Sequence, residues 1–348
     1  MDEAIKRQSL YFMSKRTVSV REETLPKMNA DQVLVQTTIS AISAGTELLI
    51  YRGEAPTQLP TDEAIRALSG KLTFPLKYGY SLIGRIIKTG TDVDPSWLNK
   101  TVFSFHPHES HFYATLDEII EIPEDIALED AVFMPNMETA FTLVMDGRPM
   151  IGEQIVILGQ GIIGLLLTAL LAQFPLGRLI TLDHYERRRE ISVSLGAHRS
   201  LDPSLPNVLE HIRSALDATG MNQRADLVYE VSGNPDALNQ AICVVGFNGR
   251  IVIGSWYGTK RVNLSLGLDF HRSRIKLLSS QVSTIAPRFR GQWTSSRRIW
   301  QVWNMLRMIQ PSGHFITHRI PFTEAAKAYE LLDRSPDKTL QVILTFRS

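Results

Sequence analysis

Three glycines near the middle of the chain have the spacing G-x-G-x-x-G, which is typical of a phosphate-binding turn. A short apolar run precedes them and helix-forming residues follow, so the segment predicts a strand, a tight turn and a helix. The backbone of such a turn can approach a pyrophosphate, and the N-terminus of the helix favours its negative charge. The predicted cofactor-binding residues of the turn are Gly159, Gly161, Ile162, Ile163 and Gly164.

An acidic residue follows about twenty positions after the last glycine, where dinucleotide sites hold the adenosine ribose. This residue is Asp183, at the end of a second apolar run, residues 178–182. Its carboxylate can bind the ribose hydroxyls and would repel a 2′-phosphate, which favours NAD over NADP. Residues 187–189 are all arginine and leave NADP possible.

Other polar residues follow the later strands of the predicted sheet. In a parallel sheet, ligands bind at the carboxyl ends of the strands, so we expect these residues to border the cofactor. They are Ser232, Gly233, Ser255 and Gln281.

The segment HPHESH, at residues 106–111, contains three histidines. An imidazole titrates near neutral pH and can exchange a proton with a substrate, so we expect His106 or His108 to have a catalytic or substrate-contacting role. His111 is expected to be structural. The other interpretation is a polar turn whose histidines cap backbone groups. A metal site with all three histidines is disfavoured, because Pro107 and the tight spacing hinder their convergence.

Composition limits the classes of protein to which the chain can belong. The 348 residues correspond to about two domains, and 37 Lys and Arg against 36 Asp and Glu give no charge excess for nucleic acid. The single cysteine, Cys243, excludes an internal disulfide and a cysteine-rich zinc lobe. The N-terminus lacks a signal-peptide core, and the longest apolar run, residues 162–172, is too short to cross a membrane. We expect a soluble cytoplasmic protein whose partner is a small-molecule substrate, with no nucleic acid and no membrane.

The elements that position these residues fall into two groups. Up to about residue 125, short strands separated by glycine and proline predict a β-rich partial barrel. From residue 152, strands and helices alternate, which predicts a doubly wound parallel sheet of the α/β class. We expect one domain over residues 1–136, completed by residues 284–348, and a dinucleotide-binding domain over residues 137–283.

The last part of the predicted sheet suggests how the chain could associate. Residues 262–268 and 275–281 are separated by a polar HRSR segment and predict a hairpin at the edge of the sheet. An exposed edge strand can pair with a second copy of the chain. We therefore expect a homodimer formed through this edge.

The order of these parts resembles the medium-chain dehydrogenase/reductase superfamily over nearly the whole chain. Besides the glycine turn, the stretches that carry the resemblance are ISAISAGTELL (39–49), YGYSLIGRIIKTGTDV (78–93), YEVSG (229–233) and PFTEAAKAYELL (321–332). The resemblance implies a GroES-like β-rich domain, a Rossmann domain, and hydride transfer between a nicotinamide cofactor and an organic substrate. It also implies that Thr139 contacts the nicotinamide ring.

The chain departs from the zinc-dependent members of that superfamily at each ligand of the catalytic metal. Ala44 takes the place of a cysteine, Tyr80 and Ser81 take the place of a His-Glu pair, and Met134 or Pro135 takes the third position. None of these residues is a normal zinc ligand. The departures therefore imply hydride chemistry without zinc.

Hydride transfer without zinc needs another group to manage the proton on the substrate oxygen. By the resemblance, Thr46 matches a hydroxyl that relays protons, and His106 falls at the end of a strand that lines the substrate pocket. Tyr80 offers a phenol, although its ordinary pKa of about 10 would have to be lowered. The candidate catalytic residues are Thr46, Tyr80, His106 and His108.

Together these features predict an NAD(H)-dependent, zinc-independent oxidoreductase that interconverts a secondary alcohol and a ketone in the cleft between its domains. A metal-free enoyl or quinone reductase, acting on a conjugated carbon-carbon double bond, is one alternative. A non-catalytic NAD-binding protein is another. A third is an unusual metal enzyme that uses Glu47, His106 and His108.

Overall fold

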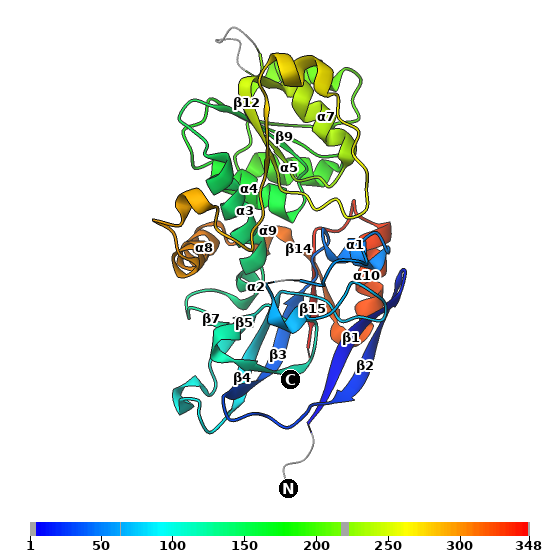
Figure 1. Ribbon diagram of the computed structural model, residues 1–348, viewed down its shortest axis with the longest axis vertical. Helices are drawn as coiled ribbons and strands as arrows, with labels where there is room; N and C mark the ends of the chain where they lie inside the picture. Colours follow the sequence, from blue (N-terminus) through cyan, green and yellow to red (C-terminus); the bar gives the residue numbers. More distant parts are fainter. Residues whose placement is uncertain (1–4, 63, 217–222, 347–348) are drawn as a thin grey trace. The chain divides into compact units, whose positions relative to one another are not determined.

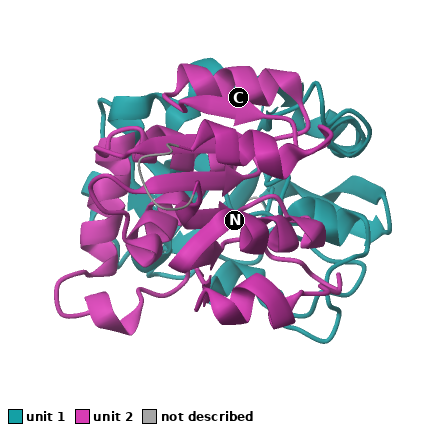
Figure 2. Cartoon of the chain, turned by 90° about the horizontal axis from the view of Figure 1, so that it is seen from above, with its two compact units in different colours: residues 1–135, 306–348 teal, residues 136–305 magenta. Residues whose placement is uncertain are grey.

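The chain folds into two compact units (Figure 2). A computed structural model describes residues 5–62, 64–216 and 223–346. Unit 1 comprises residues 1–135 and 306–348, and unit 2 comprises residues 136–305. The chain passes between the units within two helices, α3 (Met134–Gly147) and α8 (Ser295–Ile309).

The return to unit 1 comes at residue 306, later than the boundary expected from the sequence at residue 284. The first half of α8 and the segment before it pack within unit 2. Arg298 forms an ion pair of 2.7 Å with Glu138 of α3, and the rings of Trp293 and Phe141 meet at 5.5 Å. These contacts join residues that are distant in sequence, so the alternation of strands and helices could not reveal them.

A six-stranded parallel sheet forms the centre of unit 2 (Figure 1). Its strands are β8 (Gln154–Leu158), β9 (Arg178–Leu182), β10 (Arg199–Leu201), β11 (Ala225–Glu230), β12 (Val245–Ile253) and β13 (Lys276–Ser279). The connecting helices are α4 (Ile162–Leu171), α5 (Glu186–Ser194), α6 (Val208–Ala215) and α7 (Pro235–Val244). The order β10-β9-β8-β11-β12-β13 reverses between β8 and β11, which is the doubly wound arrangement that the sequence predicts.

The predicted hairpin at the edge of this sheet is wrong. β13 runs parallel to β12, and Leu266–Phe270 form a π-type helical turn instead of a strand. The apolar residues Val262 and Leu264 pack against the core of unit 2 from this loop. In a short apolar run the periodicity of the residues does not distinguish a strand from a helical turn or a buried loop. β13 is still the outer strand of the described sheet, and its pairing with a second copy stays a prediction.

Unit 1 contains the hairpin β1 (Lys6–Ser14) and β2 (Thr17–Thr24) and a larger, mostly antiparallel sheet (Figure 1). The strands of the larger sheet are β3 (Gln32–Ala41), β4 (Leu82–Thr89), β5 (Thr101–Ser104), β6 (His111–Thr115), β7 (Ile119–Glu121), β14 (Ile316–Pro321) and β15 (Gln341–Thr345). Its helices are α1 (Glu47–Tyr51), α2 (Leu128–Ala131), α9 (Ser312–Phe315) and α10 (Ala325–Arg334). Across the described part of the chain, no helix has both the length and the apolar character needed to cross a membrane.

Helix α10 places a tyrosine in the core of unit 1. Its buried residues Ala325, Ala328, Tyr329 and Leu332 recur every three or four positions, which is the spacing of one helix face. The ring of Tyr329 lies 5.2 Å from that of Phe12, so α10 and β1 share a core.

A cluster of charged side chains fastens the β1–β2 hairpin to the segment before β6. Glu109 is 1 % exposed and lies 2.8 Å from Arg7 and 2.6 Å from Lys77. Glu23 of β2 pairs with Arg7 at 2.9 Å and accepts a hydrogen bond from the hydroxyl of Tyr11. Burial by itself raises the pKa of Glu23, but the hydroxyl hydrogen bonds and the positive charges outweigh it and lower that pKa to about 2.

This cluster predicts a loss of stability in acid. The pKa of Glu23 is about 2 in the folded chain and near 4.5 without these contacts, so its stabilisation is present above pH 4.5 and is lost as the pH falls towards 2. We expect the free energy of unfolding, measured by urea denaturation, to fall across this window, and to fall less steeply in Glu23→Gln. Glu22→Gln, which alters an exposed ion pair with Lys6, should keep the wild-type slope. Equal slopes in all three proteins would contradict the assignment.

Candidate functional site

The three glycines of the turn occupy three different environments. Gly159 has a φ of +99°, and a Cβ there would lie 2.6 Å from the Cα of Ser232. A Cβ on Gly164 would lie 2.0 Å from the carbonyl oxygen of Gly159, so this glycine lets α4 approach the turn. Around Gly161, by contrast, no atom of the described residues lies within 4 Å of the Cβ position. This open space at the N-terminus of α4 fits the approach of a pyrophosphate.

Asp183 fastens the glycine turn to the end of β9. Its Oδ2 accepts a hydrogen bond of 2.8 Å from the backbone N–H of Gln160, and its Oδ1 accepts one of 2.9 Å from that of Tyr185. A guanidinium nitrogen of Arg188 lies 3.9 Å from the carboxylate. The candidate ribose-binding carboxylate therefore lies next to the turn, with a positive charge beside it.

The end of β11, across the reversal in strand order, carries a connected polar group. Glu230 is fully buried and accepts hydrogen bonds from the N–H and the hydroxyl of Ser232, at 2.8 and 2.6 Å. It also accepts one of 2.5 Å from the hydroxyl of Tyr257. The N–H of Gly233 donates to Oγ of Ser255 at 2.9 Å. Ser232, Gly233 and Ser255 are thus brought together beside the glycine turn.

Two other residues predicted to bind the cofactor come from different elements of unit 2. Gln281 is exposed after the outer strand β13, and its side chain hydrogen-bonds with Ser283 at 2.7 Å. Two strands, β11 and β12, separate β13 from β8. Thr139 lies on α3 and is partly exposed.

In unit 1, antiparallel pairing brings two candidate catalytic residues together. Ser40, near the end of β3, lies opposite Leu82 at the start of β4. The residues that follow β3 therefore meet those that precede β4. Thr46 belongs to the first segment and Tyr80 to the second.

Three hydroxyl groups meet at this end of the sheet. The hydroxyl of Tyr80 donates a short hydrogen bond to Oγ of Ser43 and lies 3.3 Å from Oγ1 of Thr46. Thr46 is the N-cap residue of α1, but its side chain makes no capping hydrogen bond with any described residue. The pKa of the Tyr80 phenol is not lowered, as a role in proton transfer at neutral pH would require: burial raises it, although the hydrogen bonds with Ser43 and Thr46 oppose the shift. We call Ser43, Thr46 and Tyr80 the hydroxyl cluster.

A buried carboxylate holds the hydroxyl cluster in place. Oε1 of Glu47 accepts a hydrogen bond of 2.8 Å from the N–H of Ser43. Its Oε2 accepts a short hydrogen bond from the hydroxyl of Tyr329 and lies 3.0 Å from Nε2 of His108. Glu47, Tyr329 and His108 are all 0 % exposed. Burial, together with the nearby carboxylate, raises the pKa of Tyr329 well above its ordinary value.

His108 connects Glu47 to the strand pair β3–β4. Its Nδ1 forms a short hydrogen bond with Oγ of Ser40, which in turn lies 2.9 Å from the carbonyl oxygen of Ser81. A Cβ on Gly79 would lie 2.7 Å from the imidazole, so the ring packs directly under the backbone next to Tyr80. Both ring nitrogens are engaged and the side chain is buried. The structure places His108 in the support of the hydroxyl cluster, and not on a surface that a substrate can reach.

His106 has a different environment. Its ring stacks on that of Phe112 at 4.0 Å, and its Nδ1 lies 3.7 Å from the carboxylate of Glu109. Burial lowers the pKa of the imidazole, so its neutral form is favoured at neutral pH. Among the described residues, no hydrogen bond or ring contact joins His106 to the hydroxyl cluster.

Ser43 and Tyr329 are missing from the candidate residues that the sequence suggests, and Glu47 is named there only for the alternative metal enzyme. All three lie in the stretches 39–49 and 321–332 that carry the family resemblance. Two features of the sequence could have indicated them: Glu47 is an acidic residue directly before the apolar run at 48–50, and Tyr329 lies on the apolar face of a helix.

The donor atoms around the hydroxyl cluster do not fit a catalytic zinc ion. Ala44 has no donor atom, and the hydroxyl of Ser81 donates to the carbonyl of Val132 at 2.6 Å. Within the residues that the structure describes, no group of three or more His, Cys, Asp or Glu side chains could hold a metal ion. Glu47 and His108 supply only two such donors, whereas catalytic zinc sites use three protein ligands.

Comparison with known proteins identifies dehydrogenases as relatives of the chain. Residues 163–295 match the family model of zinc-binding dehydrogenases. L-threonine 3-dehydrogenase of Caldanaerobacter subterraneus subsp. tengcongensis is 23% identical over 357 residues, which covers 91% of this chain and 93% of the relative. D-guloside 3-dehydrogenase of Escherichia coli K12 is 23% identical over 335 residues, with the same shares of 91% and 93%.

Solved structures confirm the predicted fold class, a GroES-like domain with a Rossmann domain. A short chain alcohol dehydrogenase from Escherichia coli CFT073, complexed with NADH, superposes with a TM-score of 0.78 at 18% identity, covering 98% of this chain and 99% of its own. A protein from Sinorhizobium meliloti 1021, bound to NADP, superposes with a TM-score of 0.76 at 18% identity and the same coverage of 98% and 99%.

Because Glu47 holds the hydroxyl cluster in place, we expect the loss of its carboxylate to lower the stability of the chain strongly. Glu47→Ala leaves the buried side chains of His108 and Tyr329 without their partner, and we expect the free energy of unfolding to fall by about 3–5 kcal/mol. Guanidinium denaturation followed by circular dichroism measures this change. Glu129→Ala is the matched control, because it breaks an exposed ion pair with Arg319 and should cost less than about 1 kcal/mol. A loss in Glu47→Ala as small as in the control would refute the role of the buried carboxylate.

Proposed function

Because the chain belongs to the medium-chain dehydrogenase/reductase superfamily, we propose that it interconverts a secondary alcohol and a ketone, with NAD(H) as cofactor and without a catalytic metal. The relatives named above are dehydrogenases, and two of the similar structures bind nicotinamide cofactors. The observation that carries the proposal is the hydroxyl cluster, which offers a proton donor where zinc-dependent members have their metal ligands.

Unit 2 supplies the residues that would hold the cofactor. The open backbone at Gly161 and the N-terminus of α4 would take the pyrophosphate, and Asp183 would take the adenosine ribose. Ser232, Gly233 and Ser255 would border the same ligand at the ends of β11 and β12. The nicotinamide ring, when bound, accepts or donates the hydride. The carboxylate of Asp183 favours NAD, and Arg188 at 3.9 Å is the feature that would allow NADP.

Unit 1 supplies the proton. Reduction of a ketone leaves negative charge on the former carbonyl oxygen, and an alkoxide takes a proton from a nearby phenol readily. Burial raises the pKa of Tyr80 and so makes the phenol a weaker acid, but an alkoxide is a much stronger base than a phenolate and can still take the proton from Oη. Ser43 and Thr46 then hydrogen-bond to the phenolate oxygen that remains. The reverse reaction returns the proton to the same oxygen.

The geometry favours Tyr80 and Thr46 over the two histidines as the proton-transfer pair. His108 is fully buried with both ring nitrogens engaged. His106 is stacked on Phe112 beside Glu109. We propose that His108 positions the hydroxyl cluster and that His106 is structural.

The proposal predicts the effect of removing one oxygen atom. Tyr80→Phe should lower kcat for NADH-dependent ketone reduction by about 100-fold or more, because the general acid is lost, and should leave the affinity for NADH unchanged. Steady-state kinetics on a panel of ketones and a panel of enones measures this. Tyr113→Phe, which removes a phenol hydroxyl from β6 of the same unit, should behave as wild type.

Each result of these assays separates the candidate functions. Unchanged kcat in Tyr80→Phe would eliminate the phenol as proton donor. Turnover of enones but not of ketones would favour a reductase of conjugated double bonds. Binding of NADH without turnover on either panel would favour a non-catalytic NAD-binding protein.

A second prediction concerns the cofactor turn. Gly161→Ala should weaken NADH binding by about tenfold or more, because the added methyl group occupies the space through which the pyrophosphate approaches. The melting temperature should hardly change, since no described atom lies within 4 Å of that Cβ. Fluorescence titration with NADH and NADPH measures both affinities. Gly313→Ala in unit 1, where the Cβ also meets no described atom within 4 Å, is the control. Unaltered NADH affinity in Gly161→Ala would rule out this mode of binding.

A further inference from the structure

Tyr78 places a second phenol next to the hydroxyl cluster. It lies two residues before Tyr80, and the two rings meet edge to face with their centroids 6.1 Å apart. The residue is only 4 % exposed, and its ring packs in the core of unit 1 that also contains Tyr329. The core therefore fixes the ring and, with it, the position of the hydroxyl group.

The hydroxyl of Tyr78 has no hydrogen-bond partner among the described residues. Buried phenol hydroxyls usually have one. The hydroxyl of Tyr229 also lacks a partner, but it is enclosed, since a Cβ on Gly147 would lie 2.1 Å from its oxygen. The Tyr78 hydroxyl is not one of the enclosed, partnerless atoms in the described part of the chain. It is therefore open to water or to a ligand, either of which can complete its hydrogen bonding.

The charges around Tyr78 determine which group of a ligand can approach it. Burial raises the pKa of its phenol, and the acidic groups of Tyr80, Glu47 and Asp62 raise it further. Negative charge near the hydroxyl repels a carboxylate or a phosphate. An uncharged hydroxyl or carbonyl oxygen, by contrast, can accept a hydrogen bond from the phenol. The surroundings of Tyr78 therefore favour a neutral oxygen atom.

A substrate that reaches the hydroxyl cluster comes close to Tyr78. Ser43, Thr46 and Tyr80 are all partly exposed, so a small molecule has access to their hydroxyl groups. Because the rings of Tyr78 and Tyr80 are in contact, both phenols can act on one small molecule. The group that Tyr78 binds must then lie near the oxygen that receives the proton from Tyr80.

We propose that Tyr78 determines substrate specificity, because its hydroxyl donates a hydrogen bond to an uncharged oxygen that the substrate carries next to the reacting carbon. The preferred substrates are then vicinal diols and α-hydroxy ketones, and not simple alcohols and ketones. This inference rests on the alcohol–ketone function proposed above, in which Tyr80 transfers the proton. Tyr78 itself takes no part in proton transfer.

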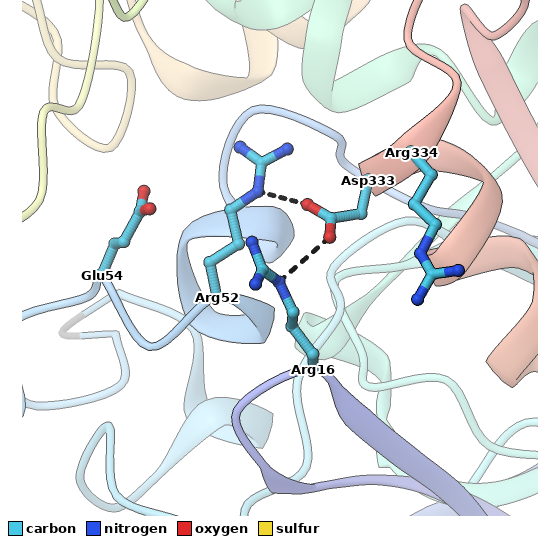
Figure 3. A pocket seen from close by; sticks show the side chains of 5 residues that line it. All are labelled: Arg16, Arg52, Glu54, Asp333 and Arg334. Carbon is cyan, nitrogen blue, oxygen red and sulfur yellow. Dashed lines mark hydrogen bonds and ion pairs between the residues drawn. The ribbon is translucent and has the colours of Figure 1, made fainter.

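A matched control lies in the same core of unit 1. Tyr51 ends helix α1 and is 6 % exposed, and burial, followed by the charges of Asp333 and Glu330, raises the pKa of its phenol. Asp333 forms an ion pair of 3.1 Å with Arg16 in a charged pocket of about 540 Å³ (Figure 3). Tyr51→Phe thus removes a phenol hydroxyl from this core whose charged neighbours are not those of Tyr78.

The first test is steady-state reduction of paired ketones with NADH. 3-Hydroxybutan-2-one carries a hydroxyl group next to the carbonyl, and butan-2-one lacks it. We expect wild type and Tyr51→Phe to prefer the hydroxylated ketone by about three- to tenfold in kcat/KM, the contribution of one hydrogen bond between neutral groups. Tyr78→Phe should lose this preference and reduce butan-2-one as wild type does. If Tyr78 only supported Tyr80, the variant would lose activity on both ketones equally, which would overturn the proposal.

The second test requires no turnover. Calorimetric titration of the whole chain, in the presence of excess NADH, compares cyclohexane-1,2-diol, cyclohexanol and 2-aminocyclohexanol. We expect the diol to bind about three- to tenfold more tightly than cyclohexanol in wild type and in Tyr51→Phe, and equally in Tyr78→Phe. Tighter binding of 2-aminocyclohexanol than of the diol would overturn the choice of a neutral oxygen. Tyr78→Phe should melt within a few degrees of wild type, since its hydroxyl has no partner within the described residues.

The two tests separate this inference from the function on which it rests. Ketone reduction without preference for the hydroxylated member, or with a preference that persists in Tyr78→Phe, would overturn the role of Tyr78 and leave the redox function intact. Absence of turnover on every ketone would count against the redox function instead. The titration would then still decide whether Tyr78 binds a neighbouring oxygen.

Discussion

Unit 1 is organised around the buried carboxylate of Glu47. A carboxylate without access to water is tolerated only when its oxygens receive hydrogen bonds, and here the donors come from three separate parts of the chain. Ser43 donates from the loop after β3, His108 lies beside the carboxylate before β6, and Tyr329 donates from α10. Because each donor must be in place, the loop after β3 and the start of β4 are fixed against each other, and Tyr80 meets Ser43 and Thr46 as a consequence.

Unit 2 is organised by a different constraint, the close approach of backbone segments. A methyl group at Gly159 or Gly164 would collide with Ser232 or with the turn itself, so the ends of β8 and β11 and the start of α4 converge only because side chains are missing there. Asp183 and Glu230 then tie the converging segments together through backbone N–H groups. The glycine turn and the end of β11 therefore meet at the reversal of strand order, which is where open α/β sheets bind ligands.

These two constraints explain what the sequence could and could not predict. The glycine turn and the parallel strands are local, since each buried strand is encoded in its own apolar run. The contact of Glu47 with Tyr329 joins residues that are separated in the sequence by the whole of unit 2, so no local sequence pattern indicates it. His106 and His108 lie two positions apart and so suggested one shared role. The structure separates them, because one ring stacks on Phe112 and the other packs against Glu47.

A site that relies on hydroxyl groups needs more exact support than one that relies on a metal. A bound zinc ion stabilises an alkoxide by its charge, which acts over several ångströms, whereas a phenol acts only at hydrogen-bonding distance and in the right direction. The buried network around Glu47 provides that fixed geometry. Its negative charge also contributes to raising the pKa of Tyr80, together with the larger effect of burial. The carboxylate that fixes the position of the phenol therefore also makes it a weaker acid, and the proton moves only because the alkoxide formed by hydride transfer is a much stronger base than a phenolate.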